Sequence, residues 1–264
     1  MLVVHTYMIH PTAIISEKAT LGENLEIGPY CVIGDHVQIG DGCVLKSHVV
    51  MEGHTDIGEN NTFFPFAAIG LQTQDLKYKG GPTYLRIGKN NTFRENTTIH
   101  SSTFADTLTS IGNHNLFLAY THVAHECKVH NHTIFSNNAS IAGHVEVFDH
   151  AILSGFAAVH QFCRVGAHSI IGGCSKIAQD VPAFTITDGN PALVRGINTI
   201  GLERRGFSSE DIRALKMAYR KLFLKKDKSL NSLLEQFSEN DAAENTQVKH
   251  LLNFITTSER GMIR

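Results

Sequence analysis

Large apolar residues recur at every sixth position along the first two thirds of the chain. Of the 29 positions reached by stepping in sixes from residue 9 to residue 177, 26 carry Ile, Leu, Val, Met or Phe. Glycine often follows directly, as at Gly28, Gly40 and Gly166. A period of six fits neither a 3.6-residue helix nor a strand that alternates every two residues. It predicts short strands joined by tight corners, each strand pointing one large side chain inward.

Three sides of six residues make a coil of about 18 residues. The hexads therefore predict nine to ten coils of a triangular parallel β-helix, an all-β domain that we place at residues 1–190. Asp75, Gly81 and Ala105 are the three positions of this series that carry no large apolar residue. They predict outward loops near 74–86 and 101–110. Four cysteines, at 31, 43, 127 and 163, occupy a small inward position and are interpreted as core residues.

The hexads stop after Pro182, and a helical pattern follows. Residues 191–264 are predicted to form a helical C-terminal domain that caps the open end of the coil. Its main helix is expected to follow Ser208 or Ser209, with acidic residues in the first turn. Shorter helices are expected near 229–237 and 246–257.

The predicted stacking of coils indicates which residues are neighbours in space. Residues separated by 18 positions in the sequence lie above one another, at a distance of roughly 4.8 Å. His125, Gly143 and Gln161 form one such column. His144 and His160 flank the column, and His122 precedes it by three residues. Two chemistries are open to this cluster. An imidazole is a general base for a hydroxyl, with the Gly143 N–H binding an oxyanion; alternatively, three imidazoles ligate Zn²⁺.

Composition and charge narrow the function classes. The net charge of −2 and pI near 6.8 argue against a general nucleic-acid-binding protein. No apolar run reaches the roughly 18 residues of a transmembrane segment, and the start does not resemble a secretion signal, so we expect a cytoplasmic protein. Residues 204–228 are basic, with nine Lys and Arg against three Asp and Glu. This segment predicts a dock for an acidic partner or a phosphorylated ligand.

Several longer motifs resemble one known family across nearly the whole chain. They are IHPTAI (9–14), IGPYCVIG (27–34), QDLKY (74–78), HVAHEC (122–127), NNASIAGHV (137–145), AVHQFCRVGAH (158–168), GGCSKIAQDVP (172–182) and GLERRGFS (201–208). With the hexads, they are similar to the acyl-carrier-protein–UDP-N-acetylglucosamine O-acyltransferases, hexapeptide-repeat enzymes that begin lipid A biosynthesis. The resemblance implies a left-handed coil and a homotrimer with active sites between subunits. It also implies transfer of a 3-hydroxyacyl chain from acyl carrier protein to the glucosamine 3-hydroxyl of UDP-N-acetylglucosamine.

The resemblance also implies roles for individual residues. His125 matches the general base, Gly143 the oxyanion donor, and Glu126 the carboxylate beside the base. Gly173 matches the position that measures acyl length. No metal or cofactor is implied beyond the phosphopantetheine of the acyl carrier protein. The carrier protein would dock on the basic 204–228 segment. Residues implied to contact the sugar nucleotide, acyl group or carrier are Gln74, Asp75, Lys77, His122, His144, His160, Gln161, Asn198, Arg204 and Arg205.

The chain departs from the family pattern at three places. Glu126 stands where the family usually has Asp, which leaves open whether it orients His125. Ile200 cannot accept a hydrogen bond from uracil, and residues 101–110 lack the usual glycines.

Two alternative functions follow from the same residues. One is an N-acyltransferase acting on a 3-amino sugar nucleotide, and the other is a zinc carbonic anhydrase built on a β-helix.

Overall fold

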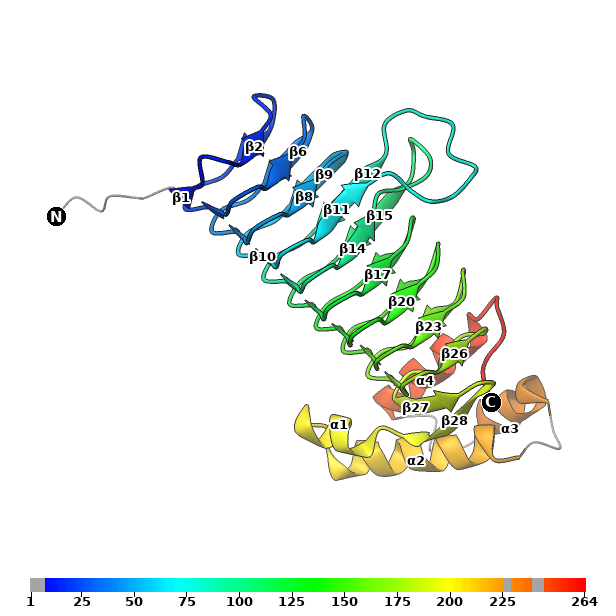
Figure 1. The fold of residues 1–264 in the computed structure, drawn as a ribbon. Coiled ribbons are helices and arrows are strands. Elements are labelled where there is room, and N and C mark those ends of the chain that lie inside the picture. The colour runs from blue at the N-terminus through cyan, green and yellow to red at the C-terminus, as the bar shows by residue number, and fades with distance from the viewer. Residues whose placement is uncertain (1–7, 226–228, 239–244) are drawn as a thin grey trace.

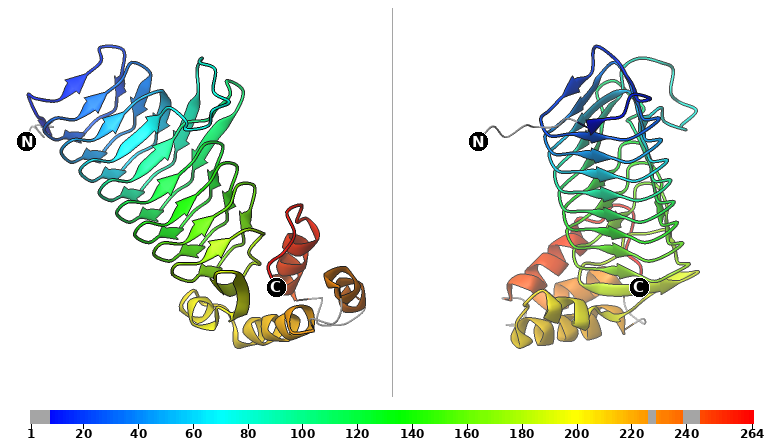
Figure 2. Two further views of the ribbon diagram at one scale, coloured as in Figure 1. Left: turned by 45° about the vertical axis from the view of Figure 1, so that its right-hand side comes forward. Right: turned by 60° about the vertical axis from the view of Figure 1, so that its left-hand side comes forward.

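The chain winds into a three-sided prism that helices close at its C-terminal end (Figure 1). The structure, a computed structural model, describes residues 8–225, 229–238 and 245–264. The prism is the predicted left-handed parallel β-helix. Its short strands stack coil upon coil from the N-terminal end toward the helices (Figure 2).

Each side of the prism is one sheet. The first sheet contains β1 (Met8–Ile9), β4 (Glu26–Ile27), β7 (Val44–Leu45), β10 (Thr62–Phe63), β13 (Thr92–Phe93), β16 (Leu116–Phe117), β19 (Ile134–Phe135), β22 (Ile152–Leu153), β25 (Ile170–Ile171), β27 (Thr185–Gly189) and β28 (Ala192–Ile197). The second contains β2 (Ile14–Ile15), β5 (Val32–Ile33), β8 (Val50–Met51), β11 (Ala68–Leu71), β14 (Thr98–His100), β17 (His122–Val123), β20 (Ser140–Ile141), β23 (Ala158–Val159) and β26 (Lys176–Ile177). The third contains β3 (Thr20–Leu21), β6 (Val37–Ile39), β9 (His54–Ile57), β12 (Tyr84–Ile87), β15 (Leu108–Ile111), β18 (Lys128–Val129), β21 (Glu146–Val147) and β24 (Arg164–Val165).

The hexad positions form the core of the prism. From Ile27 onward, every large apolar hexad residue is buried, whereas Ile9 is 41% exposed at the open N-terminal end. The cysteines at 31, 43, 127 and 163 are also fully buried, as predicted. Burial raises the pKa of the Cys127 thiol to about 12, which keeps it protonated and unreactive.

Two loops leave the stack next to each other (Figure 1). Residues 72–83 lie between β11 and β12, and residues 101–107 lie between β14 and β15. Both loops are shorter than predicted, because 84–86 and 108–110 belong to strands. Tyr84 pairs with His54 and Leu108 pairs with Tyr84, offsets of 30 and 24 residues. Both offsets exceed 18 by a multiple of six, so the inward register survives each loop.

The C-terminal domain is mostly helical and covers the end of the prism. Its helices are α1 (Thr199–Arg204), α2 (Ser209–Phe223), α3 (Leu230–Ser238) and α4 (Thr246–Thr256). Ser208 caps α2 as predicted, accepting from the Asp211 N–H. The predicted helical start at residue 191 is wrong, because 192–197 form β28, which pairs antiparallel with β27 and extends the first sheet. Within the described residues, no helix is long and apolar enough to cross a membrane.

A column of imidazoles follows one corner of the prism to the C-terminal domain. His114, His132, His150 and His168 stack with ring centroids 4.8 Å apart, and Phe184 continues the column. Burial, reinforced by His150 and Arg205, lowers the pKa of His168 to about 4. The His168 Nδ1 is buried without a hydrogen-bond partner. Burial also lowers the pKa of His150, so protonation of His150 and His168 is unfavourable in the folded state.

The lowered pKa of His150 and His168 predicts that the protein loses stability in acid. An unfolded histidine has a pKa near 6.5, so between pH 6.5 and 4 the unfolded chain binds more protons than the folded chain. Stability should therefore be full above pH 6.5 and fall progressively below it. His168→Phe should reduce this loss and raise the free energy of unfolding at neutral pH by up to about 1 kcal/mol, since it removes an unsatisfied buried nitrogen. Urea unfolding of both proteins at pH 7 and pH 5 measures this; equal pH sensitivity would contradict it.

Candidate active site

The predicted histidine column lies at the corner between the second and third sheets. His125 and Glu126 follow β17, and Gly143 lies on the next coil, where the His144 N–H bonds to the His125 carbonyl. The His125 ring lies directly over Gly143. A Cβ added to Gly143 would lie 2.3 Å from His125 Cε1 and 2.5 Å from Nε2. Only glycine leaves room for the imidazole here.

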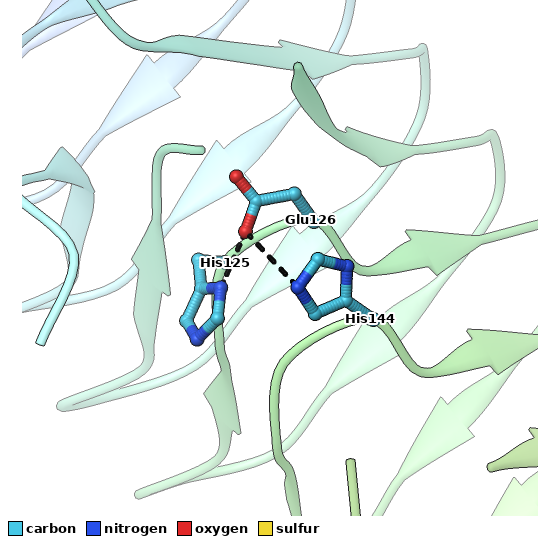
Figure 3. Close-up of side chains that lie close together, drawn as sticks. All are labelled: His125, Glu126 and His144. Atoms are coloured by element: carbon cyan, nitrogen blue, oxygen red, sulfur yellow. Dashed lines mark hydrogen bonds and ion pairs between the residues drawn. The ribbon is translucent and has the colours of Figure 1, made fainter. Parts of the chain in front are cut away.

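Glu126 orients the His125 ring. Its Oε2 accepts a hydrogen bond from His125 Nδ1, and His144 Nε2 lies 3.8 Å from the same oxygen (Figure 3). Glu126 Oε1 accepts from the Thr103 N–H and from the Thr107 hydroxyl. Burial raises the pKa of the Glu126 carboxyl, but these hydrogen bonds outweigh burial and hold it below its ordinary value. The ionised carboxylate leaves the His125 proton on Nδ1 and a lone pair on Nε2.

The free nitrogen of His125 faces an open cavity of about 490 Å³. Its nearest charged neighbour is Asp75 Oδ2, at 3.7 Å, in the first outward loop. Gly143 lines the same cavity, and its N–H donates to no group in the described part of the chain. A base and an unused backbone donor thus face one space, an arrangement suited to acyl transfer.

The cavity collects seven of the predicted residues on one chain. They are Gln74, Asp75, Lys77, His122, His125, Gly143 and Gln161. His144 does not line the cavity; it packs edge-on against His125 and stacks on Phe162. His160 also lies outside the lining, where its Nδ1 accepts a hydrogen bond from Arg260 at 2.9 Å. That bond leaves the proton of a neutral His160 on Nε2.

The other predicted residues lie apart from this cavity within one chain. Asn198 is buried, caps α1 and donates to the His168 carbonyl. Arg205 is half-buried and donates to the Gly201 and His150 carbonyls, whereas Arg204 is exposed. Gly173 is exposed between β25 and β26, on the corner between the first and second sheets, and a Cβ there would meet only the Gly155 carbonyl oxygen, at 3.4 Å. Their predicted contacts with substrate or carrier stay predictions.

His100 is a cavity residue that sequence reasoning missed. Its ring lies 4.8 Å from that of His122, and its buried Nδ1 has no hydrogen-bond partner among the described residues. Burial, with His122 and His125 nearby, lowers the pKa of His100 to about 4. His122 also has a lowered pKa through burial, and its Nδ1 bonds to Thr98 Oγ1 at 2.8 Å. Both rings are therefore neutral at pH 7. β14 pairs with β17 at an offset of 24 residues instead of 18. This longer offset is the sequence signal that would have placed His100 near His122.

The zinc alternative has a partial counterpart in the structure. Ligand atoms of His125, Glu126 and His144 lie within 4.8 Å of one another. However, His125 Nδ1 and Glu126 Oε2 already share a proton in a hydrogen bond. A metal ion would have to displace this proton and separate the pair, so these residues fit a histidine–carboxylate pair better than a preformed metal site.

Comparison with known proteins identifies relatives over nearly the full length. A family model described as UDP-N-acetylglucosamine O-acyltransferase, domain 2, matches residues 180–263, and a bacterial transferase hexapeptide model matches residues 18–53. The acyl-[acyl-carrier-protein]–UDP-N-acetylglucosamine O-acyltransferase of Akkermansia muciniphila is 58% identical over 96% of this chain and 98% of its own. Among solved structures, the UDP-N-acetylglucosamine acyltransferase of Bacteroides fragilis superimposes with a TM-score of 0.94 at 38% identity, covering 97% of this chain and 100% of its own.

A second solved structure, from Acinetobacter baumannii, has a TM-score of 0.93 at 44% identity, with 97% of this chain and 100% of that one covered. These relatives support neither the carbonic anhydrase nor the 3-amino acceptor. Identity at this level over the whole chain, on a shared fold, makes the protein an acyltransferase. The chain belongs to the acyl-[acyl-carrier-protein]–UDP-N-acetylglucosamine O-acyltransferase family.

Proposed function

We propose that the protein transfers a 3-hydroxyacyl chain from acyl carrier protein to the glucosamine 3-hydroxyl of UDP-N-acetylglucosamine, the first step of lipid A biosynthesis. The observation that carries this proposal is the pairing of His125 Nε2 with the unused Gly143 N–H in one cavity. The relatives named above act on this acceptor according to their names. The proposed mechanism uses neither a metal ion nor a cofactor beyond the phosphopantetheine of the carrier.

The reaction needs one base, one oxyanion donor and one acid. His125 Nε2 removes the proton of the 3-hydroxyl as its oxygen attacks the thioester carbon. The Gly143 N–H donates to the oxygen that becomes negative in the tetrahedral intermediate. Glu126 stabilises the imidazolium through Nδ1. When the intermediate collapses, the C–S bond breaks and Nε2 returns the proton to the departing thiolate.

The remaining cavity residues are proposed to bind the sugar nucleotide and acyl chain. Asp75 and Lys77 supply opposite charges on one loop, with Gln74 beside them. His122 and Gln161 extend the polar wall along the coils, and His160, which lies outside the cavity lining, is proposed to offer its Nε2 proton to the substrate. Neutral His100 and His122 favour hydroxyl groups over charged groups at this wall.

We propose a homotrimer whose active sites lie between subunits. Asn198 is proposed to contact the substrate at such a site. A row of exposed aromatic side chains supports an interface on one edge of the second sheet. Tyr30, Phe66, Tyr120 and Phe156 are each 56–63% exposed at every second turn of the same corner, with His48, Asn96 and Asn138 at the turns between them. Solvent-exposed apolar rows of this length are typical of contacts between proteins. We also propose a cytoplasmic location, because all five cysteines are free, as expected in a reducing compartment.

Acyl carrier protein is proposed to dock on the basic 204–228 segment, of which residues 226–228 lie outside the described residues. Arg213, Lys216 and Arg220 are exposed on one face of α2, and Arg204 is exposed nearby. Arg204→Glu should raise the KM for the carrier by about tenfold, and added salt should weaken this difference. Arg205→Glu should instead lower the stability of the fold, because the Arg205 guanidinium donates hydrogen bonds to two backbone carbonyls and a carboxylate cannot. A carrier KM insensitive to Arg204→Glu and to salt would contradict this dock.

Gly173 is proposed to measure the acyl chain. Because a Cβ there makes only one ordinary contact, with the Gly155 carbonyl oxygen at 3.4 Å, Gly173→Met should fold normally and block the far end of a long chain. The preferred donor should shorten, with at least about a tenfold loss for the longest chain accepted by the wild type. Gly196→Met is the control, since no atom lies within 4 Å of a Cβ added at Gly196 and the new side chain should again fit without a clash. An unchanged chain-length profile in steady-state assays would reject the role of Gly173.

The function itself is tested by acyl transfer on chelator-treated protein. UDP-N-acetylglucosamine is offered with 3-hydroxyacyl carriers of several lengths, and the product is identified by mass. We expect transfer that survives chelation and peaks at one chain length. Transfer only to the 3-amino sugar nucleotide would replace the acceptor in this proposal, and activity restored only by Zn²⁺ would overturn the mechanism.

A further inference from the structure

The short loop of residues 101–107 holds the Glu126 carboxylate on the side away from His125. Glu126 Oε2 faces His125, whereas Oε1 accepts from the Thr103 N–H and from the Thr107 hydroxyl, the latter at 2.7 Å. The Glu126 side chain is only 6% exposed, so water does not substitute freely for these donors. Each carboxylate oxygen therefore has its own protein partner.

The hydroxyl of Thr107 has two acceptors and a single proton. The Phe104 carbonyl oxygen lies 2.8 Å from it, close to the 2.7 Å of Glu126 Oε1. A hydrogen bond to an ionised carboxylate is stronger than one to a neutral carbonyl, so the proton favours Glu126. The backbone at Glu126 is held separately. Its φ is +52°, in the left-handed region, and its N–H donates to Thr109 Oγ1 at 2.8 Å.

The same loop is connected to the outward loop that carries Asp75. Thr103 Oγ1 donates to Thr73 Oγ1 at 3.2 Å, and Thr73 Oγ1 also accepts the Asp75 N–H at 3.1 Å. Asp75 Oδ2 in turn lies 3.7 Å from His125 Nε2. Hydrogen bonds thus run from the carboxylate behind the imidazole to the loop in front of it.

We propose that Thr107 is a positioning residue that clamps the Glu126 carboxylate against His125, so that a glutamate can orient the base at this corner. This inference rests on the proposed function, in which His125 is the base and Glu126 orients it. A carboxylate on a longer side chain has one more rotatable bond, and an anchor on Oε1 removes that freedom. The anchor comes from this chain's own loop, whose residues 101–107 contain threonines and no glycine.

The test compares Thr107→Val, which removes the hydroxyl at nearly constant shape, with Thr107→Ser, which keeps it. We expect Thr107→Val to lower kcat by about tenfold, with the KM for UDP-N-acetylglucosamine changed less than about twofold. The acidic limb of the kcat/KM profile should move to lower pH, because a loosened carboxylate stabilises the imidazolium less. Thr107→Ser should restore both. Wild-type kcat and pH profile in Thr107→Val would overturn the proposal.

A double-variant cycle separates positioning through Glu126 from a general effect on the fold. In a Glu126→Ala background, Thr107→Val should cause no further loss, because its target is gone. An equal loss in both backgrounds would reject the inference. Glu126→Asp should also be slower than wild type, since the shorter side chain cannot reach Thr107 and His125 together. Thr62→Val, the same change on β10 where the hydroxyl makes no described hydrogen bond, is the control and should match wild type.

Failure of this inference is distinguishable from failure of the proposed function. A slow Glu126→Ala with a fully active Thr107→Val would reject the clamp alone. A fully active Glu126→Ala would remove the orienting role of Glu126 from the mechanism, and Thr107 with it. Thermal melting of each variant measures folding independently, and a Thr107→Val that melts with wild type while losing activity supports the clamp.

Discussion

His125→Ala is expected to lower kcat by about 10²–10⁴-fold while leaving the protein folded. The ring carries the base at Nε2, and its side chain is partly exposed, at 14%, to the cavity. Its removal leaves the core of hexad residues untouched. Steady-state kinetics with saturating UDP-N-acetylglucosamine and carrier measure the effect. The KM for either substrate should change much less than kcat, because the lost interaction acts mainly in the transition state.

His132→Ala provides the matched control for the loss of an imidazole. His132 is an exposed member of the imidazole column on another corner, where it stacks between His114 and His150. It should keep wild-type turnover. Near-normal turnover in His125→Ala would remove His125 as the base, whereas equal losses in both variants would point to a structural effect.

Gly143→Ala is expected to lower kcat by at least about 10²-fold with a small change in stability. The added methyl would overlap the His125 ring, with Cε1 at 2.3 Å and Nε2 at 2.5 Å. The ring is the far end of a side chain beside an open cavity, so it can move aside. It cannot do so and keep both the Glu126 hydrogen bond and its place over the oxyanion donor.

Kinetics and chemical unfolding of Gly143→Ala measure the two effects separately. Gly196→Ala is the control, because no atom lies within 4 Å of its new Cβ. Gly28→Ala gives the opposite pattern, since its Cβ would lie 2.9 Å from the backbone carbon of Lys46, which cannot move aside. We expect Gly28→Ala to lose stability and Gly143→Ala to lose activity. Full activity in Gly143→Ala would show that the ring and the oxyanion donor need no such contact.

Much of the architecture was predictable from the sequence, because the fold is periodic. A coil of constant length places every residue above its counterpart 18 positions earlier, so one repeat length determined the core, the three sheets and the column of His125, Gly143 and Gln161. Two loops that insert multiples of six residues preserved this register. The helices of the C-terminal domain followed from their own 3.6-residue pattern and from the Ser208 cap.

Only the tertiary structure decided the features that break this periodicity. Residues 192–197 read as the start of a helix, but the last coil offered an open sheet edge, and pairing with β27 prevailed over local propensity. Asp75 lies close to His125, and Thr107 donates a hydrogen bond to Glu126, because of the way in which two loops fold back. Arg260 reaches His160 across 100 residues of sequence. No repeat length encodes these contacts, because each arises where chain segments without a common period meet in space.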